Sequence, residues 1–442
     1  MVEPAVAAAP RPNVIFIVAD DLGYADLGCY GGRAPVSPVL DGLAAKGLRF
    51  TQGYANSPVC SPTRFALMTG RYQYRLRGAA EEPISIRTRG STTLGLPPQH
   101  PTLPSLLKSS GYRSALIGKW HLGFPPSFGP LRSGYEEFFG PMSGGVDYFG
   151  HTASNGAHDL WDGEDERFDT GYLTDLISRR AVSYIERMAR GSAPFFLSLH
   201  YTAPHWPWET RDDAMLAPQL REQLFHLHGG NIHSYRRMIQ HMDEGIGWIM
   251  DALRSQGIAE HTLVIFTSDN GGERFSDNWP LVGGKMDLTE GGIRVPWIAH
   301  WPALIAPGGV SEQHCLTMDW SATVLAAAGV PPDPAYPLDG VSLLAVLRDA
   351  AHQFARPMFW RMKHRQQRAL RRGDWKYLQV DSHEYLFNLP ADERERANQA
   401  AREPDRLAAM RNTWLTWNAT MPAIPDEAVV SAGFSVKDMP QR

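Results

Sequence analysis

The segment Asn13-Val14-Ile15-Phe16-Ile17-Val18-Ala19-Asp20-Asp21 joins a short apolar run to two acidic residues. An apolar run of this length predicts a buried strand when helical patterns follow it along the chain. In an open α/β sheet, ligands bind beyond the carboxyl ends of the strands. The segment therefore predicts an α/β fold in which Asp20 and Asp21 lie at a binding site.

Three further apolar runs have the same arrangement. They are residues 112–117, followed by Gly118-Lys119-Trp120-His121; residues 194–199, followed by His200-Tyr201-Thr202-Ala203-Pro204-His205; and residues 262–267, followed by Ser268-Asp269-Asn270-Gly271-Gly272. Four apolar runs that each end in charged or metal-binding groups predict that these groups converge at one edge of a sheet.

Helical patterns alternate with these runs at residues 37–46, 102–110 and 235–255. The alternation predicts a large α/β domain with a mostly parallel central sheet flanked by helices. Acidic residues inside the helices, such as Asp243 and Glu244, are expected to be structural or solvated rather than catalytic.

The chain has 442 residues, which is too long for one ordinary domain. From about residue 355 short apolar segments and a helical pattern at residues 403–417 predict a small α+β domain with an antiparallel sheet, and residues 371–374 predict a hairpin turn within it. We therefore divide the chain into a disordered Ala/Pro-rich start at residues 1–11, a catalytic domain at residues 12–354, and a small C-terminal subdomain at residues 355–442.

The composition excludes several classes of protein. With 43 basic and 47 acidic residues, the chain has no global charge that would attract nucleic acid or an anionic membrane. No apolar run is long enough to span a membrane, and the first residues lack the features of a secretory signal. We expect a soluble protein, either cytoplasmic or periplasmic/secreted after removal of a leader. Cys29, Cys60 and Cys315 allow at most one disulfide and have no metal-binding spacing.

The acidic pairs predict a metal site. Asp20, Asp21, Asp269 and Asn270 offer carboxylate and amide oxygens, which suit a hard divalent cation, and no nearby cysteine or histidine pattern indicates zinc. Calcium fits best and magnesium second. The similar pair Asp277-Asn278 follows no apolar run and reads as a loop that ends at a proline, so we do not assign it to the metal.

The pentapeptide Cys60-Ser61-Pro62-Thr63-Arg64 fits the C-x-P-x-R pattern in which an enzyme oxidises the cysteine to formylglycine. The aldehyde hydrates to a geminal diol, which supplies one hydroxyl to attack and a second to expel the product. Ser61 as N-cap and Pro62 at the first helical position predict a helix start here, whose free N–H groups favour an anion. The alternative is a small buried thiol beside a helix cap.

Six motifs occur in order along the chain: Asp20-Asp21; Cys60-x-Pro62-x-Arg64 with Thr69-Gly70-Arg71; Gly118-Lys119-Trp120-His121-Leu122-Gly123; Pro204-His205; Asp269-Asn270-Gly271; and Gly284-Lys285. In this order they resemble the type I sulfatases, of the arylsulfatase and N-acetylgalactosamine-6-sulfatase kind. The resemblance runs from about residue 12 to residue 395 and includes residues 385–389. It implies an alkaline-phosphatase-like fold and the hydrolysis of a sulfate ester.

The resemblance also implies a role for each motif residue. Calcium would be bound by Asp20, Asp21, Asp269, Asn270 and the modified Cys60. The metal would lower the pKa of the formylglycine hydroxyl, with Asp269 as a plausible base, and attack on sulfur would leave a covalent sulfate hemiester.

The remaining implied roles concern proton transfer and charge. His205, with Lys285, would donate a proton to the leaving oxygen, and His121 would take the proton from the second hydroxyl. Arg64 and Lys119 would orient the diol and offset negative charge in the transition state.

The resemblance also implies a substrate that is a sulfated small molecule or a sulfated sugar, and a formylglycine-generating maturation enzyme as a partner. Candidates for contacts to the sulfate or the leaving group are Ser143, His151, Asn155, His158, Trp161, Trp206 and Trp208. Two alternatives remain open at this point. One is a phosphonate or phosphate ester hydrolase of the same superfamily, and the other is a catalytically inactive protein that binds sulfated glycans.

Overall fold

The computed structural model describes residues 11–221 and 229–431. The predicted disordered start therefore lies outside the described residues, except for Arg11. Within the described residues the main sheet has the strand order β11-β2-β10-β9-β1-β8-β4-β5-β6-β7. The four predicted strands are its centre: β1 (Asn13–Ala19), β4 (Arg113–Gly118), β8 (Phe195–His200) and β9 (Thr262–Ser268).

These central strands are parallel to one another. β1 pairs in parallel with both β8 and β9, and β8 pairs in parallel with β4. Antiparallel pairing enters at β10, which lies beside β9 and β2. The other strands of the sheet are β2 (Leu48–Phe50), β5 (Glu137–Gly140), β6 (Trp161–Asp162), β7 (Asp165–Glu166), β10 (Trp297–His300) and β11 (Gly309–Ser311). The predicted mostly parallel sheet is confirmed.

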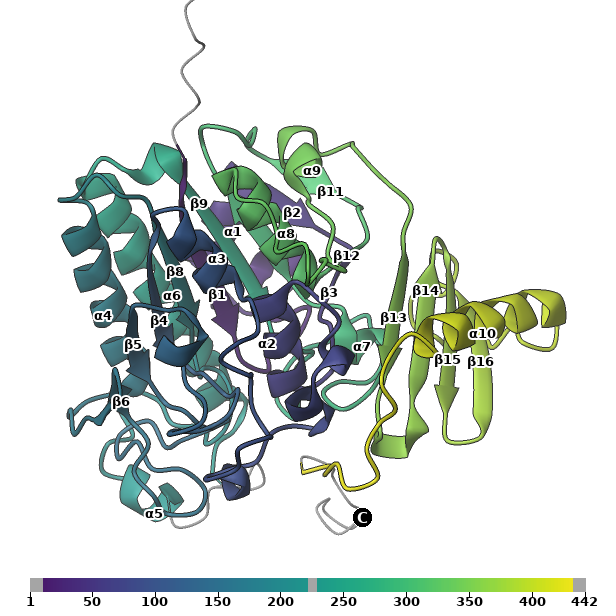
Figure 1. The fold of residues 1–442 in the computed structure, drawn as a ribbon, viewed down its shortest axis with the longest axis horizontal. Helices are drawn as coiled ribbons and strands as arrows, with labels where there is room; N and C mark the ends of the chain where they lie inside the picture. Colours follow the sequence, from purple (N-terminus) through teal and green to yellow (C-terminus); the bar gives the residue numbers. More distant parts are fainter. Residues whose placement is uncertain (1–10, 222–228, 432–442) are drawn as a thin grey trace, which may run out of the picture.

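Helices cover both sides of the sheet, which explains why residues 14–19 of β1 are all apolar. Val14, Phe16 and Val18 belong to one core, with helices α2 (Cys60–Thr69), α3 (Leu103–Ser109) and α8 (Thr317–Ala328). The alternate residues of β1 belong to a second core, with helices α1 (Pro38–Lys46), α4 (Leu173–Met188) and α6 (Ile232–Ser255) (Figure 1). Because successive side chains of a strand point to opposite faces, a strand buried on both faces must be apolar throughout.

A second, four-stranded antiparallel sheet lies beside the first (Figure 1). It contains β13 (Pro357–Arg361), β14 (Arg368–Arg372), β15 (Trp375–Val380) and β16 (His383–Asn388), and α10 (Pro404–Asn418) packs on it. The predicted strands, hairpin and helix are confirmed, whereas the domain boundary near residue 355 stays a prediction. Trp360 links the small sheet to the large domain, because its indole N–H donates at 2.9 Å to the carbonyl of Ala55, which follows β3 (Gly53–Tyr54).

The remaining elements are short. They are α5 (Ala217–Arg221), α7 (Glu290–Ile293), α9 (Leu344–Arg348), and the two-stranded sheet of β3 (Gly53–Tyr54) and β12 (Cys315–Leu316). No helix among the described residues is both long enough and apolar enough to cross a membrane.

Asp243 of α6 has the structural role expected from the sequence. Its buried carboxylate accepts hydrogen bonds from the backbone N–H groups of Val39 and Leu40, both at 2.9 Å. These donors lie in the first turn of α1, where N–H groups have no partner within the helix. Asp243 therefore caps α1 from a different helix.

We predict that Asp243→Ala destabilises the protein by about 1–3 kcal/mol, because two buried N–H groups lose their acceptor. The midpoint of thermal unfolding would fall by several degrees. Asp251→Ala on the same helix is the matched control, since Asp251 is exposed and pairs only with the exposed Arg254. Equal midpoints for the two variants would show that Asp243 does not stabilise α1.

Candidate active site

The acidic pairs that follow β1 and β9 meet at one end of the main sheet. Ligand atoms of Asp20, Asp21, Asp269 and Cys60 all lie within 4.8 Å of one another, and all four residues are buried. Parallel pairing brings the pairs together, because Ala19 of β1 lies opposite Ser268 of β9. The predicted convergence of these groups is confirmed.

Two buried oxygens of this cluster have no hydrogen-bond partner among the described residues: Oδ1 of Asp20 and Oδ1 of Asn270. The Asn270 amide nitrogen donates to Asp21 Oδ1 at 2.7 Å, so the Asn270 amide oxygen remains available as a ligand. Burial and the nearby Asp269 carboxylate raise the pKa of Asp20 to about 8. Unpartnered buried oxygens in a cluster of carboxylates fit a bound cation, because burial of such groups is otherwise costly.

Three buried cations surround the acidic cluster, one for each carboxylate. Lys119 Nζ lies 2.6 Å from Asp20 Oδ2, and Lys285 Nζ lies 2.6 Å from Asp21 Oδ2. Arg64 donates to Asp269 Oδ2 from Nε at 3.1 Å and from Nη2 at 2.8 Å.

The charges shift the pKa values of this group. Burial lowers the pKa of Lys285, but Asp21 and its other anionic neighbours outweigh burial and hold it well above the usual value. Burial likewise raises the pKa of Asp21, but Lys285 and His205 outweigh it and hold this pKa below the usual range. Asp21 and Lys285 therefore form an ionised pair.

Cys60 is the first residue of α2, and its backbone follows the N-cap residue Val59. The predicted cap at Ser61 is wrong, because the Ser61 hydroxyl instead accepts the N–H of Ile84 at 2.9 Å. Burial raises the pKa of the Cys60 thiol well above its usual value, which disfavours the thiolate and makes the unmodified side chain a weak nucleophile. A thiol is also a soft ligand, whereas an oxygen at this position would complete an all-oxygen set.

His121 presents an unprotonated nitrogen to the site. Its Nε2 lies 2.7 Å from the Ile84 carbonyl, which can only accept, so Nε2 carries the proton. The buried Nδ1 has no partner among the described residues. Burial and Lys119 lower the pKa of His121 well below the usual value. His121 is therefore neutral, with Nδ1 free to accept a proton.

His205 lies near Asp21 and Lys285. Its Nδ1 donates to the Trp206 carbonyl at 2.5 Å, and its Nε2 lies 3.6 Å from Asp21 Oδ2. Burial and the charge of Lys285 lower the pKa of His205 well below the usual value.

A cavity of about 930 Å³ opens above the cluster and is lined by Cys60, His121, His205 and Lys285. Among the residues predicted to contact the sulfate or the leaving group, Ser143, Asn155 and Trp206 line this cavity. His151, His158, Trp161 and Trp208 are not part of its lining; Trp208, for example, packs on Phe275 in the core. Arg64 and Lys119 also lie behind the cavity wall, where they contact the carboxylates.

Sequence reasoning missed three parts of the lining, and the largest is a segment between residues 77 and 94 that includes residues 83–88. Glu273 lies 3.4 Å from Lys285 Nζ, and its position just after Asp269-Asn270-Gly271-Gly272 could have indicated it. The third part comes from the far C-terminus, at Glu427 and residues 429–431. No local sequence signal marks those residues.

Together the fold and the site define a hydrolase of anionic esters with an alkaline-phosphatase-like architecture. The family model described as Sulfatase matches residues 12–330, so the chain belongs to the sulfatase family and is a sulfuric ester hydrolase. The predicted family and activity are confirmed, and the phosphonate hydrolase and inactive glycan-binding alternatives fit less well.

Relatives of known activity and structure agree with this assignment. The chain is 35% identical to N-acetylgalactosamine-6-sulfatase of Homo sapiens over 80% of this chain and 69% of that protein. It is 34% identical to arylsulfatase A of Homo sapiens over 77% of this chain and 69% of that protein. It also resembles the crystal structure of Ps i-CgsB in complex with k-i-k-neocarrahexaose, with a TM-score of 0.82 and 31% sequence identity. The match covers 92% of this chain and 93% of that chain.

We predict that a divalent cation stabilises the folded protein, because it would compensate the unpartnered oxygens of Asp20 and Asn270. Chelation with EDTA followed by desalting would lower the midpoint of thermal unfolding, and calcium would restore it. Asp269→Asn removes one ligand charge and would weaken the response, whereas Asp277→Asn, in the neighbouring loop, would retain it. A wild-type midpoint that is independent of EDTA and calcium would contradict a cation at this site.

Proposed function

We propose that this sulfatase is a calcium-dependent enzyme that removes sulfate from a sugar by means of a formylglycine at position 60. The observation that carries the proposal is the position of Cys60, which lies at a helix N-terminus with ligand atoms within 4.8 Å of those of three carboxylates. A maturation enzyme would have to oxidise this cysteine before activity appears. Magnesium is the second choice for the ion.

The proposed calcium ligands are oxygens of Asp20, Asp21, Asp269 and Asn270, together with an oxygen on the modified residue 60. When bound, the cation stabilises negative charge on a sulfate oxygen and lowers the pKa of a coordinated hydroxyl. Asp269 would accept the proton of the attacking hydroxyl, and its two hydrogen bonds with Arg64 support this role by fixing its orientation.

Lys119 and Arg64 would act mainly by orientation and charge. Arg64 also donates to the Lys119 carbonyl at 3.2 Å, so the two cations are held together below the cavity. Because both are buried, their charges are weakly screened and would offset the negative charge that grows as sulfur is attacked.

We assign His121 as the base that takes the proton of the second hydroxyl, which must leave before sulfate is released. The free Nδ1 and the Nε2–H bond to Ile84 support this role, because they fix the tautomer that a base requires. Its lowered pKa keeps the ring unprotonated at neutral pH.

His205 and Lys285 are the proposed proton donors to the leaving oxygen. In the described state the pKa of His205 is depressed, first by burial and then by the charge of Lys285. An anionic ester bound beside the ring would raise this pKa, because a nearby negative charge favours the protonated form. Lys285 is protonated in any case, and its place in the cavity lining supports a shared role.

A sulfated sugar is the proposed substrate class. The cavity volume of about 930 Å³ is at the upper end of the range for small-molecule sites, and Ser85, Thr88, Ser154, Asn155 and Trp206 line it. Hydroxyl, amide and indole groups suit the hydroxyls and apolar faces of sugar rings. The activity named for the N-acetylgalactosamine-6-sulfatase relatives supports the same class.

We predict that co-expression with a formylglycine-generating enzyme lowers the mass of the Cys60 peptide by about 18 Da, the difference between a thiol and an aldehyde side chain. The modified protein would hydrolyse an aryl sulfate faster than the matching aryl phosphonate. Cys60→Ala would abolish turnover without unfolding the protein, and Cys29→Ala is the control that retains it. A preference for the phosphonate would contradict the sulfatase proposal. An unmodified, inactive protein from the native host would instead support a binding protein.

We predict that His205→Ala slows sulfate esters with poor leaving groups far more than activated aryl sulfates, since only an alkoxide needs a proton to depart. The difference would be on the order of 10²-fold, the usual contribution of general acid catalysis. Measuring kcat for 4-nitrophenyl sulfate and for a sugar sulfate would test it. His151→Ala is the matched control, because His151 is buried but does not line the cavity. Equal losses on both substrates would remove His205 from the acid role.

A further inference from the structure

The cavity has one wall that comes from the far end of the chain. After α10 the chain turns back from the small sheet toward the end of α2 (Figure 1). Residues 427–431 form an extended segment with a single β-bridge, which we call the C-terminal strand. This segment reaches the rim of the cavity and supplies Glu427, Val429, Val430 and Ser431 to its lining. Val429 is 52% exposed, so an apolar side chain faces solvent at this position.

The C-terminal strand is bonded to residues 81–84 as a short parallel bridge between Glu82 and Val430. The Glu82 N–H donates to the Val429 carbonyl at 2.9 Å, and the Ser431 N–H donates to the Glu82 carbonyl at 2.9 Å. The Ser431 hydroxyl also donates to the Pro83 carbonyl at 2.7 Å. Backbone hydrogen bonds therefore fix the register of this strand on the rim.

Residues 81–84 connect the C-terminal strand directly to the catalytic groups. On their inner side, Ile84 binds the ring of His121 through its carbonyl and the hydroxyl of Ser61 through its N–H. The same short segment thus holds His121 on one side and the C-terminal strand on the other. Val429 lines the same cavity as His121, so a substrate bound in this cavity can contact both the catalytic groups and the C-terminal strand.

We propose that the C-terminal strand is a specificity-determining wall for the leaving group, and that Lys363 and Glu82 are the positioning residues that hold it. This inference rests on the proposed sugar sulfatase function. The small antiparallel sheet then has a functional role, because Lys363 lies just after its strand β13.

Lys363 and Glu82 hold the C-terminal strand through complementary hydrogen bonds. The Lys363 ammonium donates to the carbonyl oxygens of Asp426 and Ala428, the latter at 2.7 Å. The Glu82 carboxylate accepts the N–H groups of Lys363 at 2.6 Å and His364 at 2.9 Å. Three distant segments of the chain therefore meet at these two side chains.

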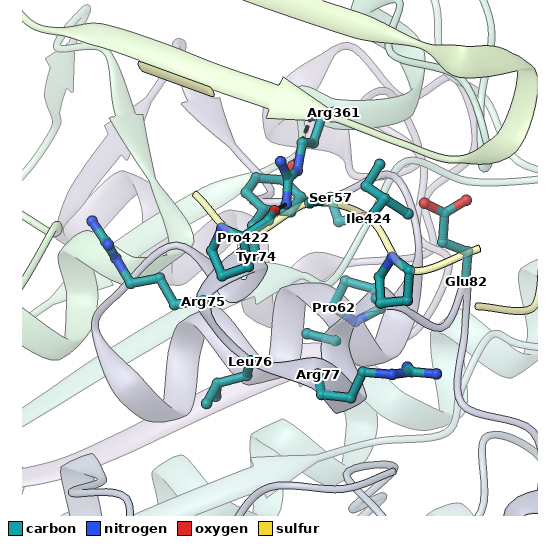
Figure 2. A pocket seen from close by; sticks show the side chains of 14 residues that line it. Ser57, Pro62, Tyr74, Arg75, Leu76, Arg77, Glu82, Arg361, Pro422 and Ile424 are labelled. Atoms are coloured by element: carbon teal, nitrogen blue, oxygen red, sulfur yellow. Dashed lines mark hydrogen bonds between the residues drawn. The ribbon is translucent and has the colours of Figure 1, made fainter. Parts of the chain in front are cut away.

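The segment that leads to this wall passes over a second cavity. This cavity of about 260 Å³ is lined by Tyr74, Arg361, Pro422 and Ile424, among others (Figure 2). Arg361 donates to the Pro422 carbonyl beside this space.

The test compares selectivity in three variants. Lys363→Met removes the hydrogen bonds from the Lys363 ammonium to the C-terminal strand. Val429→Trp narrows the cavity beside this strand, and Lys108→Met is a control at an exposed lysine of α3. The readout is the ratio of kcat/KM for a sulfated disaccharide to kcat/KM for 4-nitrophenyl sulfate. The disaccharide is the one that the wild type hydrolyses fastest in a panel of sulfated mono- and disaccharides.

We expect the ratio to fall about tenfold in Lys363→Met and in Val429→Trp, mainly through a higher KM for the disaccharide, and to stay at the wild-type value in Lys108→Met. Circular dichroism would verify that each variant is folded. Parallel losses on both substrates, or an unchanged ratio in both variants, would overturn the inference.

The wild-type result separates this inference from the function on which it rests. Hydrolysis of 4-nitrophenyl sulfate without hydrolysis of any saccharide in the panel would overturn the leaving-group wall and leave the sulfatase assignment intact. Hydrolysis of neither substrate by protein with a converted Cys60 would instead contradict the proposed function.

Discussion

The ion pairs at the ends of β1 and β9 are the constraint on which the rest of the site depends. Three buried carboxylates, Asp20, Asp21 and Asp269, each contact one buried cation, which lowers the cost of placing these groups together in the interior. A buried charge without a partner would cost several kcal/mol, and each pair is therefore essential to its neighbours. A divalent cation bound among these carboxylates would add positive charge at the site, which favours an anionic ester.

The same constraint explains why the surrounding elements are buried so completely. Every residue of α2 is buried, and this helix delivers both Cys60 at its first position and Arg64 one turn later. A helix covered on all sides cannot shift easily, because close-packed interiors resist small displacements. Cys60 and Arg64 are therefore fixed relative to the strand ends.

The catalytic end of the large sheet and the small sheet are joined by more than one type of contact. Trp360 bonds to the Ala55 carbonyl in the core, while Lys363 and Glu82 bond at the rim of the cavity. The first contact is buried, and neither of its residues lines the cavity. The second links the small sheet to the surface that the leaving group of a substrate would meet.

The sequence by itself determined the four central strands, the acidic pairs after two of them, and the sulfatase motifs. These features are local: an apolar run and the residues that follow it are adjacent in the chain, and parallel pairing brings such ends together. Sequence patterns misassigned the cap of α2 to Ser61, because the partner of that hydroxyl, Ile84, is set by packing more than 20 residues away.

Only the tertiary structure decided which polar residues line the cavity. His151 and Trp208 are close in sequence to Asn155 and Trp206, yet they are not part of the lining. The C-terminal strand carries no motif, and it reaches the site because Glu82 and Lys363 bind it across about 350 and 65 residues of chain. Contacts between segments so far apart depend on the path of the whole chain, which no local pattern encodes.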